Sequence, residues 1–503
     1  MTPPTEILVR VDASPATGLG HAMRCLALAQ GWKDSGGSAA FLLAESLPAV
    51  EERLAEEGIE TLRLGAAVGS DEDARRTGQI AAQRGAAWVI VDGYRFGAGY
   101  LKALKASSRR ILAFDDYGHA GHYGTDLVLN QNASASPELY ADREPATRLL
   151  LGPRYALLQR DFRARPRVTR TIAPRAQKIL VTLGGVDAAN VTRTVLRALA
   201  AVPVPDADVR VVVGSANPNR KDLEAAASAG RRITLQRDPR SLAELMAWAD
   251  LALTGAGTTT YEVAYMGVPS LLIVVAENQR LAAKALEAAG VAKDLGWHAD
   301  LTVPRLAEAI AGLAMDAATR ERMSRNGRDL VDGQGVSRVV TNLRAGIIDL
   351  QPVREEDARL LWEWANDPSV RSVSFTRDPI AWEDHLRWFD AKRKDAACLF
   401  YIARDDAGEP LGQIRFEARE DEAEVSVSLD ARHRGRGQGS ALILAGSRKV
   451  FDTSRVRTLH AYIKDGNEPS VRAFTKAGYV FEAMATVRGQ KASRFVLRKE
   501  ASG

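Results

Sequence analysis

The sequence predicts an α/β protein made of two parallel-sheet domains in succession, followed by a smaller α+β domain. Up to about residue 346, short apolar runs alternate with segments of helical periodicity, which is typical of parallel sheets covered on both faces. A basic stretch with prolines, residues 160–175, interrupts this series once and is predicted to be a linker. After the second series, strictly alternating runs indicate antiparallel strands. We therefore expect domains at residues 1–158, 176–346 and 350–500.

Length and charge agree with a globular protein of several domains. A chain of 503 residues is too long for one hydrophobic core and suggests about three or four units. The net charge of +5, from 68 Lys and Arg against 63 Asp and Glu, is small for this length and does not favour nucleic acid as a partner. No apolar run approaches the length of a membrane span, and the N-terminus lacks the features of a signal peptide, so we expect neither.

The two cysteines, Cys25 and Cys398, are far apart and have no partners at metal-ligand spacing. A disulfide framework and a zinc site are therefore not expected, and this cysteine usage fits a reducing cytoplasm. No acidic cluster with ligand spacing stands beside the phosphate-type loop described below, so no metal is expected. The predicted partners are small molecules, not a membrane, and the predicted assembly is a monomer or a weak homo-oligomer.

In the first domain, polar residues follow several predicted strands at the point where each strand ends. Ligands of open parallel sheets bind beyond these carboxyl ends. A helix cap or an Asx turn explains any single Asp, but several at corresponding ends favour a cleft. Strands are expected at residues 7–11, 39–43, 88–91, 111–114 and 127–129 and helices at 49–57 and 99–106, with the polar positions at Asp12, 92–94, 115–116 and 130–132.

The stretch Gly18-Leu19-Gly20-His21 joins the first strand to a helix predicted to begin near Ala22. Two glycines let the backbone turn tightly and approach a ligand, and the N-terminus of the helix favours an anion. His21 lies inside this turn and can accept a proton near neutral pH. The alternative is a glycine turn with a structural histidine.

The second domain carries a similar loop rich in hydroxyl groups. A short strand runs into Gly255-Ala256-Gly257, and a helix follows with Glu262 in its first turns. Loop amides would hold a diphosphate, and the carboxylate of Glu262 would accept hydrogen bonds from ribose hydroxyls. A glycine C-cap followed by a Thr N-cap is the alternative, and the lack of a Walker motif disfavours an NTPase. Strands are expected at residues 178–183, 209–213, 233–235, 251–253 and 270–275, with glycine turns at 184–187 and 214.

Over about residues 5–346 the sequence resembles the UDP-sugar hydrolase of pseudaminic acid biosynthesis. The motifs that carry this resemblance are residues 18–29, 92–94, 184–187, 255–262 and 277–279. The family resembles glycosyltransferases with two Rossmann-like domains in GT-B arrangement. The resemblance implies that His21 is the general base for inverting attack of water at the anomeric carbon. It further implies Tyr94 and Asn278 as catalytic residues near the sugar, and Gly18, Gly20, Arg24, Asp92, Gly185, Gly255, Gly257, Thr258, Thr259, Glu262 and Gln279 as substrate or UDP ligands.

This chemistry is consistent with general principles. UDP is a good leaving group once backbone amides meet its charge, so no strong general acid is needed. One base that holds water on the opposite face of the sugar is enough for inversion. Either Asp12 or Asp92 could orient His21.

The C-terminal third is rich in aromatic residues, most of which are expected to pack in a core. Strands are expected at residues 399–404, 411–416 and 423–429, with a hairpin turn at 405–409, and the aromatic residues are Trp362, Trp364, Trp382, Trp388 and Phe389. A basic glycine loop, residues 434–439, follows the third strand and leads into a helix. Alone, such a loop could bind RNA or another phosphate.

This loop resembles motif A of the GCN5-related N-acetyltransferases (GNAT), and residues 459–463, 467–474 and 478–479 resemble later parts of the same family. The resemblance implies a GNAT-type α+β domain with acetyl-CoA as cosubstrate. The implied ligands are Leu429, Arg434, Gly435, Arg436, Gly437, Gln438, Gly439, Ser440, Asn467 and Ser470. The positive charge is expected from Arg432, Arg434 and Arg436.

One position departs from the family pattern. Phe474 stands where many members carry the tyrosine that reprotonates the CoA thiolate. Tyr462, Tyr479 or water could take that role, and the general base is equally open. The weak candidates for the base are Glu417, Glu424 and His433, or a water relay.

The two resemblances together predict a bifunctional enzyme, and the run 362–366 also resembles the acetyltransferase of the same pathway. The C-terminal domain would N-acetylate a UDP-4-amino-4,6-dideoxy sugar, and the N-terminal part would hydrolyse the product to UDP and free 2,4-diacetamido sugar. The alternatives are a glycosyltransferase fused to an acetyltransferase, a nucleotide-sugar sensor, a protein acetyltransferase with an inert first half, and a related diamino-sugar enzyme of legionaminic type.

Overall fold

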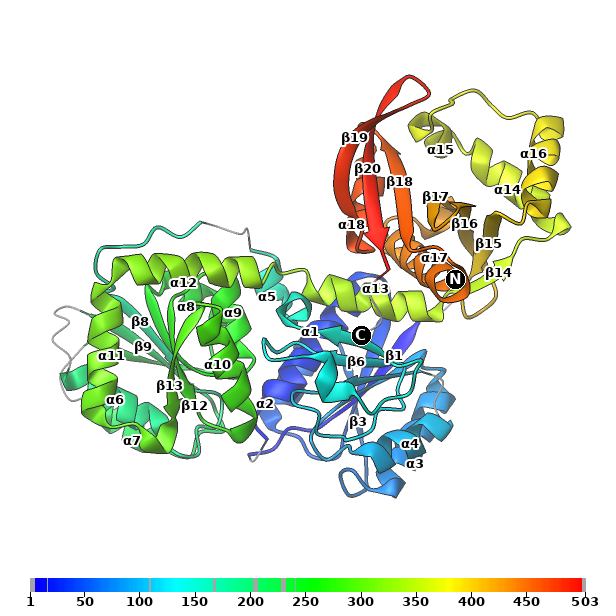
Figure 1. Cartoon of the computed structure of the whole chain (residues 1–503). Coiled ribbons are helices and arrows are strands. Elements are labelled where there is room, and N and C mark those ends of the chain that lie inside the picture. The colour runs from blue at the N-terminus through cyan, green and yellow to red at the C-terminus, as the bar shows by residue number, and fades with distance from the viewer. Residues whose placement is uncertain are drawn as a thin grey trace. The chain divides into compact units, whose positions relative to one another are not determined.

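The computed structural model describes residues 5–15, 17–107, 110–165, 169–201, 207–227, 232–239 and 241–499. The chain divides into two compact units, Met1–Val336 and Ser337–Gly503. The first unit contains two parallel sheets, and the second contains one mixed sheet (Figure 1). The predicted fold class, two Rossmann-like domains followed by an α+β domain, is confirmed.

The first sheet has the strand order β3-β2-β1-β4-β5-β6-β7, with every pair parallel. All five expected strands form, but β3 and β7 were not predicted. Both are edge strands that are only partly buried, so neither shows the apolar run of a central strand. The bounds are β1 (Glu6–Val11), β2 (Ser38–Leu43), β3 (Glu60–Arg63), β4 (Trp88–Asp92), β5 (Ile111–Phe114), β6 (Leu127–Asn130), β7 (Arg148–Leu151), α1 (Gly20–Asp34), α2 (Pro48–Glu56), α3 (Asp71–Arg84), α4 (Ala98–Ser107), η1 (Pro137–Tyr140) and η2 (Pro153–Tyr155).

Two local expectations need correction. Helix α1 begins at Gly20, not near Ala22, so His21 lies in its first turn. The predicted linker 160–175 is not irregular at its start, because Arg160–Arg163 forms helix α5. The cause is burial of Phe162, which is 2% exposed and packs in the core of the second sheet. Residues 166–168 of that stretch lie outside the described residues.

The second sheet has the order β10-β9-β8-β11-β12-β13, also parallel throughout. Its strands bury both faces: Ile179 and Val181 belong to one core, and Leu180 belongs to the other. The edge strand β13 was not predicted. The bounds are β8 (Lys178–Thr182), β9 (Asp208–Val213), β10 (Ile233–Arg237), β11 (Leu251–Gly255), β12 (Ser270–Val274), β13 (Ala292–Trp297), α6 (Val191–Ala201), α7 (Arg220–Ala227), α8 (Leu242–Trp248), α9 (Thr259–Tyr265), η3 (Glu277–Gln279), α10 (Arg280–Ala288), η4 (His298–Asp300), α11 (Val303–Met315), α12 (Ala317–Leu330) and α13 (Gly335–Ile347).

Each parallel sheet reverses its strand order at one point. In the first sheet this is between β1 and β4, and in the second it is between β8 and β11. Parallel sheets bind ligands outside the carboxyl ends of the strands at such a point, because the neighbouring loops diverge there. The loop of His21 follows β1, and the loop of Gly255 to Gly257 follows β11. The topology therefore places both predicted loops where a ligand site is expected.

The second unit has the strand order β14-β15-β16-β17-β18-β20-β19. Its pairs are antiparallel, as predicted, except that β17 and β18 are parallel. The bounds are β14 (Asp349–Pro352), β15 (Cys398–Arg404), β16 (Pro410–Arg419), β17 (Glu422–Leu429), β18 (Thr458–Lys464), β19 (Val480–Val487), β20 (Gln490–Arg498), η5 (Glu355–Asp357), α14 (Ala358–Asn366), α15 (Pro368–Val373), α16 (Trp382–Lys394), η6 (Ala431–His433), α17 (Gln438–Thr453) and α18 (Glu468–Lys476).

Most of the aromatic residues predicted to lie in a core do so. Trp364 and Phe389 are buried in a cluster between the sheet and helices α14 and α16. The ring system of Trp362 packs edge-to-face on that of Trp382. Trp388 is the exception, because 37% of it is exposed. No helix in the described ranges has the length and apolar character needed to cross a bilayer.

Candidate active sites

His21 is held by a carboxylate from the adjacent strand. Its Nδ1 lies 2.6 Å from Asp92 Oδ1, at the end of β4. Because an ionised carboxylate can only accept, the short contact assigns the proton of the neutral ring to Nδ1 and its lone pair to Nε2, as a general base requires. Asp12, the other carboxylate considered for this role, instead accepts from the amides of Ala44 and Glu45. The structure therefore brings Asp92, not Asp12, to His21.

Arg24 joins this pair from the next turn of α1. Its guanidinium makes two 2.7 Å hydrogen bonds to Asp92 and a 2.8 Å hydrogen bond to Asp116. Burial alone would raise the pKa of Asp92, but the charge of Arg24 and the hydrogen bonds from Arg24 and His21 outweigh burial and hold the pKa below its ordinary value. Arg24, Asp92 and Asp116 together carry a net charge of about −1, so a proton taken by His21 would neutralise the cluster. The donors of Arg24 are engaged within the protein, which favours a supporting role over contact with substrate.

Tyr94 links the cluster to the second sheet. Its hydroxyl donates to Asp116 Oδ2 at 2.7 Å and accepts from Asn278 Nδ2 at 2.6 Å. The ring meets the edge of the His21 ring at 4.7 Å between centroids. Burial and the nearby Asp116 raise the pKa of Tyr94, so this hydroxyl keeps its proton. Two predicted catalytic residues from different sheets thus lie in hydrogen-bond contact.

The two halves of the first unit also meet through small residues. A Cβ built on Gly185 would lie 2.8 Å from the Leu19 side chain, and one built on Gly20 would lie 3.7 Å from Thr258 Oγ1. The loops that follow β1, β8 and β11 therefore approach one another closely. At Gly185 no side chain fits without displacing Leu19.

The loop after β11 is supported by Gln279. Its side-chain oxygen accepts from the amide of Val275 at 3.0 Å, and a Cβ on Gly257 would lie 3.4 Å from its side-chain nitrogen. Thr258 stands at the N-cap of α9 and Thr259 is the first residue of that helix. Glu262 lies in the first turn and is 9% exposed, and burial raises its pKa to about 8. A carboxyl group in this state can both donate to and accept from a diol.

Asp116, Asn132 and Tyr261 lie at this site but were not among the predicted site residues. Asp116 accepts from Arg24, Tyr94 and Asn132, and Tyr261 donates to Asn132 Oδ1 at 3.1 Å while accepting from the amide of Ala133. Asp116 and Asn132 follow strands β5 and β6, so their places at adjacent strand ends were a usable signal. Tyr261 has no such signal, because its partner comes from the other sheet.

In the second unit, the parallel ladder between β17 and β18 is short. Only Glu422, Ala423 and Glu424 pair, with residues Thr458 to His460. Beyond them β17 continues to Leu429 with its ladder only on the β16 side, apart from the Leu429 carbonyl, which accepts from Arg434. Unpaired backbone donors and acceptors in the middle of a sheet are available to a ligand.

The predicted glycine loop begins just beyond this opening. Gly435 and Gly437 both have φ of +77°, and a Cβ on either would meet nothing within 4 Å, so backbone conformation is what requires glycine. The Gln438 side-chain oxygen is buried without a hydrogen-bond partner. An orphaned acceptor beside open backbone fits a bound group with donors of its own. Ser440 is buried in α17, and Asn467 caps α18 by accepting from the amide of Ser470 at 3.3 Å.

The arginines of this loop divide into two kinds. Arg434 donates twice to the carbonyl of Leu429, at 3.1 and 2.8 Å, and also bonds to Asp367 and Ser369. Arg432 forms a two-pronged ion pair with Asp430. Arg436 is exposed. The charge that Arg434 and Arg432 were expected to offer a ligand is therefore engaged locally, and Arg434 fixes the strand end instead.

The acid and base candidates of the second unit differ in access. The hydroxyl of Tyr479 is buried against Ser447 Oγ at 2.9 Å, and burial raises its pKa. Phe474 is buried and packs edge-to-face on the Tyr479 ring. Tyr462 is half-buried on β18, at the open part of the ladder. This placement favours Tyr462 over Tyr479 as a proton donor.

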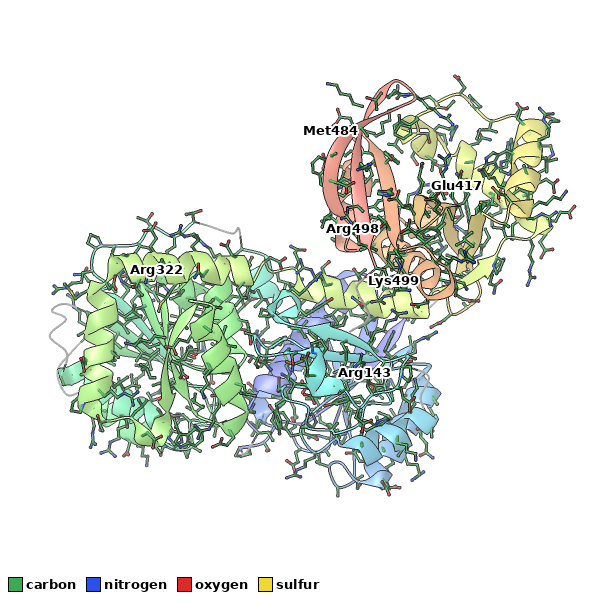
Figure 2. The ribbon with its side chains drawn as sticks, in the orientation of Figure 1. Arg143, Arg322, Glu417, Met484, Arg498 and Lys499 are labelled. Carbon is green, nitrogen blue, oxygen red and sulfur yellow. The ribbon has the colours of Figure 1, made fainter. Side chains whose placement is uncertain are left out.

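Glu417, labelled in Figure 2, is bound by Lys392 at 2.8 Å and Arg415 at 3.1 Å. Burial opposes ionisation, but Lys392 and Arg415 hold the pKa of Glu417 below its ordinary value. This weakens Glu417 as a base near neutral pH. Glu424 is exposed on β17, and His433 is half-exposed in η6.

Two family comparisons match this chain. Residues 178–334 match the glycosyltransferase family 28 C-terminal domain, and residues 348–480 match the acetyltransferase (GNAT) domain. SpsG, the spore coat polysaccharide biosynthesis protein of Bacillus subtilis, is 31% identical over 250 residues, which are 49% of this chain and 73% of SpsG.

Two further relatives match one part each. The UDP-2,4-diacetamido-2,4,6-trideoxy-beta-L-altropyranose hydrolase of Campylobacter jejuni is 24% identical over 290 residues, 57% of this chain and 97% of that enzyme. The putative phosphinothricin acetyltransferase YwnH of Bacillus subtilis is 30% identical over 142 residues, 26% of this chain and 85% of YwnH. The predicted two-part resemblance is therefore confirmed. The chain belongs, through its first unit, to the SpsG-like proteins related to glycosyltransferase family 28 and, through its second, to the GNAT acetyltransferases.

Proposed function

We propose that the protein is a bifunctional enzyme of pseudaminic acid biosynthesis. The second unit N-acetylates a UDP-4-amino-4,6-dideoxy sugar with acetyl-CoA. The first unit then hydrolyses UDP-2,4-diacetamido-2,4,6-trideoxy-β-L-altropyranose to the free sugar and UDP. The observation that carries the hydrolase half is the 2.6 Å contact of His21 Nδ1 with Asp92, which leaves Nε2 as the basic nitrogen.

In the proposed hydrolysis, a water molecule next to His21 attacks the anomeric carbon from the face opposite UDP. The proton of the water passes to Nε2 and a new bond forms between the water oxygen and the anomeric carbon. The bond between the anomeric carbon and the β-phosphate oxygen breaks, which inverts the configuration at that carbon. Loop amides at Gly255 to Thr258 stabilise the departing diphosphate. Glu262 holds the ribose, and Tyr94 and Asn278 position the sugar.

In the proposed acetylation, the 4-amino group of the sugar attacks the thioester carbonyl of acetyl-CoA. The C–N bond forms, the amine loses a proton, and the C–S bond breaks to release CoA. The pantetheine chain would pair with the open edge of β17, and the pyrophosphate would lie on the loop of residues 434–439. Tyr462 is the residue we propose as the proton donor to the thiolate.

We place both reactions in the cytoplasm, where UDP-sugars and acetyl-CoA are made. Both cysteines are free thiols, in agreement with a reducing compartment. The proposal names the altro-configured sugar because of the Campylobacter jejuni relative.

The decisive experiment supplies UDP-4-amino-4,6-dideoxy-N-acetyl-altrosamine with and without acetyl-CoA, and follows free UDP, CoA and sugar mass together. The proposal expects UDP only when acetyl-CoA is present, and expects His21→Ala to stop at the acetylated UDP-sugar. Release of CoA without UDP from the unaltered protein would contradict the hydrolase half.

A glycosyltransferase is the second candidate, and the match to glycosyltransferase family 28 favours it. Such an enzyme would pass the sugar to an acceptor hydroxyl instead of to water. It predicts that the rate of UDP release rises with the concentration of an added acceptor. A hydrolase releases UDP at a rate that no acceptor changes.

A further inference from the structure

Tyr117 is the one exposed aromatic residue among the described residues of the first unit, with 40% of its surface accessible. Burying an aromatic ring is favourable, so a ring that stays exposed while charged side chains next to it are buried is unusual. It stands directly after Asp116 and therefore at the carboxyl end of β5, next to the strand that carries Asp92. Contacts between aromatic rings connect Tyr117 with the candidate base, His21.

A continuous set of rings leads from His21 to Tyr117. The His21 and Tyr94 centroids are 4.7 Å apart, and the Tyr94 and Tyr117 centroids are 5.4 Å apart. The Tyr94 hydroxyl is held by Asp116 and Asn278, so the ring in the middle is fixed. Tyr117 thus presents an apolar surface one side chain beyond the residue that contacts the base.

The backbone of this turn is held in one conformation. The carboxylate of Asp115 accepts from the amides of Tyr117 at 2.7 Å, Gly118 at 2.5 Å and His119 at 3.1 Å. The hydroxyls of Tyr123 and Tyr140 donate to the same carboxylate.

Gly118 adds a steric reason for this conformation. Its φ is +80°, and a Cβ there would lie 2.9 Å from the Leu139 carbonyl oxygen. The turn is therefore ordered before any ligand binds, although the ring that it carries is exposed. Preorganised loops that carry exposed aromatic rings are typical of recognition surfaces.

We infer that Tyr117 is a specificity-determining residue that forms an apolar wall for the sugar of the nucleotide substrate. This inference rests on the proposed function, because it takes the reacting carbon to lie beside His21. Sugar rings present a face of C–H groups that packs on aromatic rings, and a 6-deoxy sugar adds a methyl group to that surface. The ligand class is therefore a UDP-linked deoxy sugar, with the methyl or C–H face toward Tyr117.

The test compares Tyr117→Ala with Tyr117→Phe, which keeps the ring, and measures affinity for the acetylated UDP-sugar and for UDP alone. Removing the ring is expected to weaken UDP-sugar binding and raise KM about tenfold. The affinity for UDP and kcat are expected to stay unchanged, because the second sheet binds UDP. Tyr117→Phe is expected to match the unaltered protein in all four measurements, and melting temperatures check that both variants fold.

The outcomes separate this inference from the proposed function. If the unaltered protein binds the UDP-sugar no more tightly than UDP and does not hydrolyse it, the proposed function fails. If it prefers the UDP-sugar and Tyr117→Ala keeps the same preference, the assignment of Tyr117 is wrong while the proposed function stands. An equal loss of affinity for UDP and UDP-sugar in Tyr117→Ala also overturns the assignment, because it would show a general structural role.

Discussion

The candidate site of the first unit consists mainly of side chains, whereas that of the second unit consists mainly of backbone. In the first unit, His21 is fixed by side chains, with Asp92, Arg24 and Asp116 buried and hydrogen-bonded to one another. In the second unit, the site is mostly backbone: an unpaired strand edge along β17 and two glycines with φ of +77°. Substitutions should therefore act differently in the two sites. Side-chain truncation should abolish the first reaction, whereas only a change of backbone conformation should weaken the second strongly.

His21→Ala should separate the two reactions most clearly. Loss of a general base costs roughly 10²- to 10⁴-fold in rate. We expect UDP release from the acetylated UDP-sugar to fall by about 10³-fold, while CoA release stays unchanged because the acetylation site has its own unit. His122→Ala is the matched control, since His122 also bonds a carboxylate, Asp142, at 2.7 Å. Equal rates of UDP release from the two variants would remove His21 from the mechanism.

A second prediction compares two buried carboxyl groups within the first unit. Cations offset the burial of Asp92, whereas burial alone raises the pKa of Glu262 from 4.5 to about 8. The folded protein therefore holds a proton on Glu262 that the unfolded chain has released, and stability falls as pH rises from about 4.5 to about 8.

The fall should amount to a few kcal/mol, since each unit of pKa is worth about 1.4 kcal/mol. Urea denaturation at several pH values checks this in Glu262→Gln and in Glu308→Gln, a change at an exposed position of α11. Glu262→Gln should match the unaltered protein near pH 4.5, become the more stable of the two as pH rises toward 8, and keep that advantage above pH 8, while Glu308→Gln should follow the unaltered protein. Parallel curves for all three proteins would contradict the assignment.

Asp92→Asn should lower kcat for hydrolysis by about 10²-fold with little change in KM. The amide no longer selects the Nδ1–H tautomer of His21, and a protonated ring loses its counter-charge. Asp12→Asn is the control, because Asp12 also pairs with the buried Arg10, at 2.7 Å, but does not contact His21. Steady-state rates across pH 6–9 measure the catalytic loss. Circular dichroism would detect a folding defect. A larger loss in Asp12→Asn than in Asp92→Asn would reverse the assignment of the orienting residue.

Gly437→Ala should weaken acetyl-CoA binding about tenfold, because alanine at a left-handed φ costs about 1–2 kcal/mol. Gly408→Ala introduces the same strain at φ +82° in the hairpin between β15 and β16, and should leave the affinity unchanged. Arg436→Ala should cost only about threefold, since an exposed charge contributes little. Calorimetric titration with acetyl-CoA gives all three values. A greater loss in Arg436→Ala than in Gly437→Ala would show that charge, not backbone conformation, dominates this site.

The predictions from sequence were most accurate where a residue's role depends on its own neighbours in the chain. The central strands were found because both faces are buried, and the loops of Gly18, Gly435 and Gly437 because a positive φ demands glycine there. The edge strands β3, β7 and β13 were missed because partial burial leaves mixed sequences. Phe162 was assigned to a linker because the core that buries it comes from elements far along the chain.

The same reason explains what was missed at the first site. Asp116 lay among the polar residues at strand ends, yet nothing local shows that it accepts from Arg24, Tyr94 and Asn132 together. Tyr261 bonds Asn132 across the two sheets, and such a pair has no spacing in sequence. Arg434 shows the opposite case, because the motif was recognised but the Leu429 carbonyl takes its donors. A motif identifies a loop, whereas the partners of each side chain come from the fold.

Because only three residue pairs join β17 and β18, the rest of β17 is open when no cosubstrate is bound, and this affects how well the protein resists aggregation and proteolysis. An open strand edge is a template on which another extended chain can add, and proteins usually cover such edges. In the proposed complex the cosubstrate would do so, and acetyl-CoA would then act as a protective cap as well as a reactant. We expect the second unit to aggregate and to be cleaved by proteases more readily when acetyl-CoA is scarce, which would tie the abundance of the enzyme to the supply of its own acetyl donor.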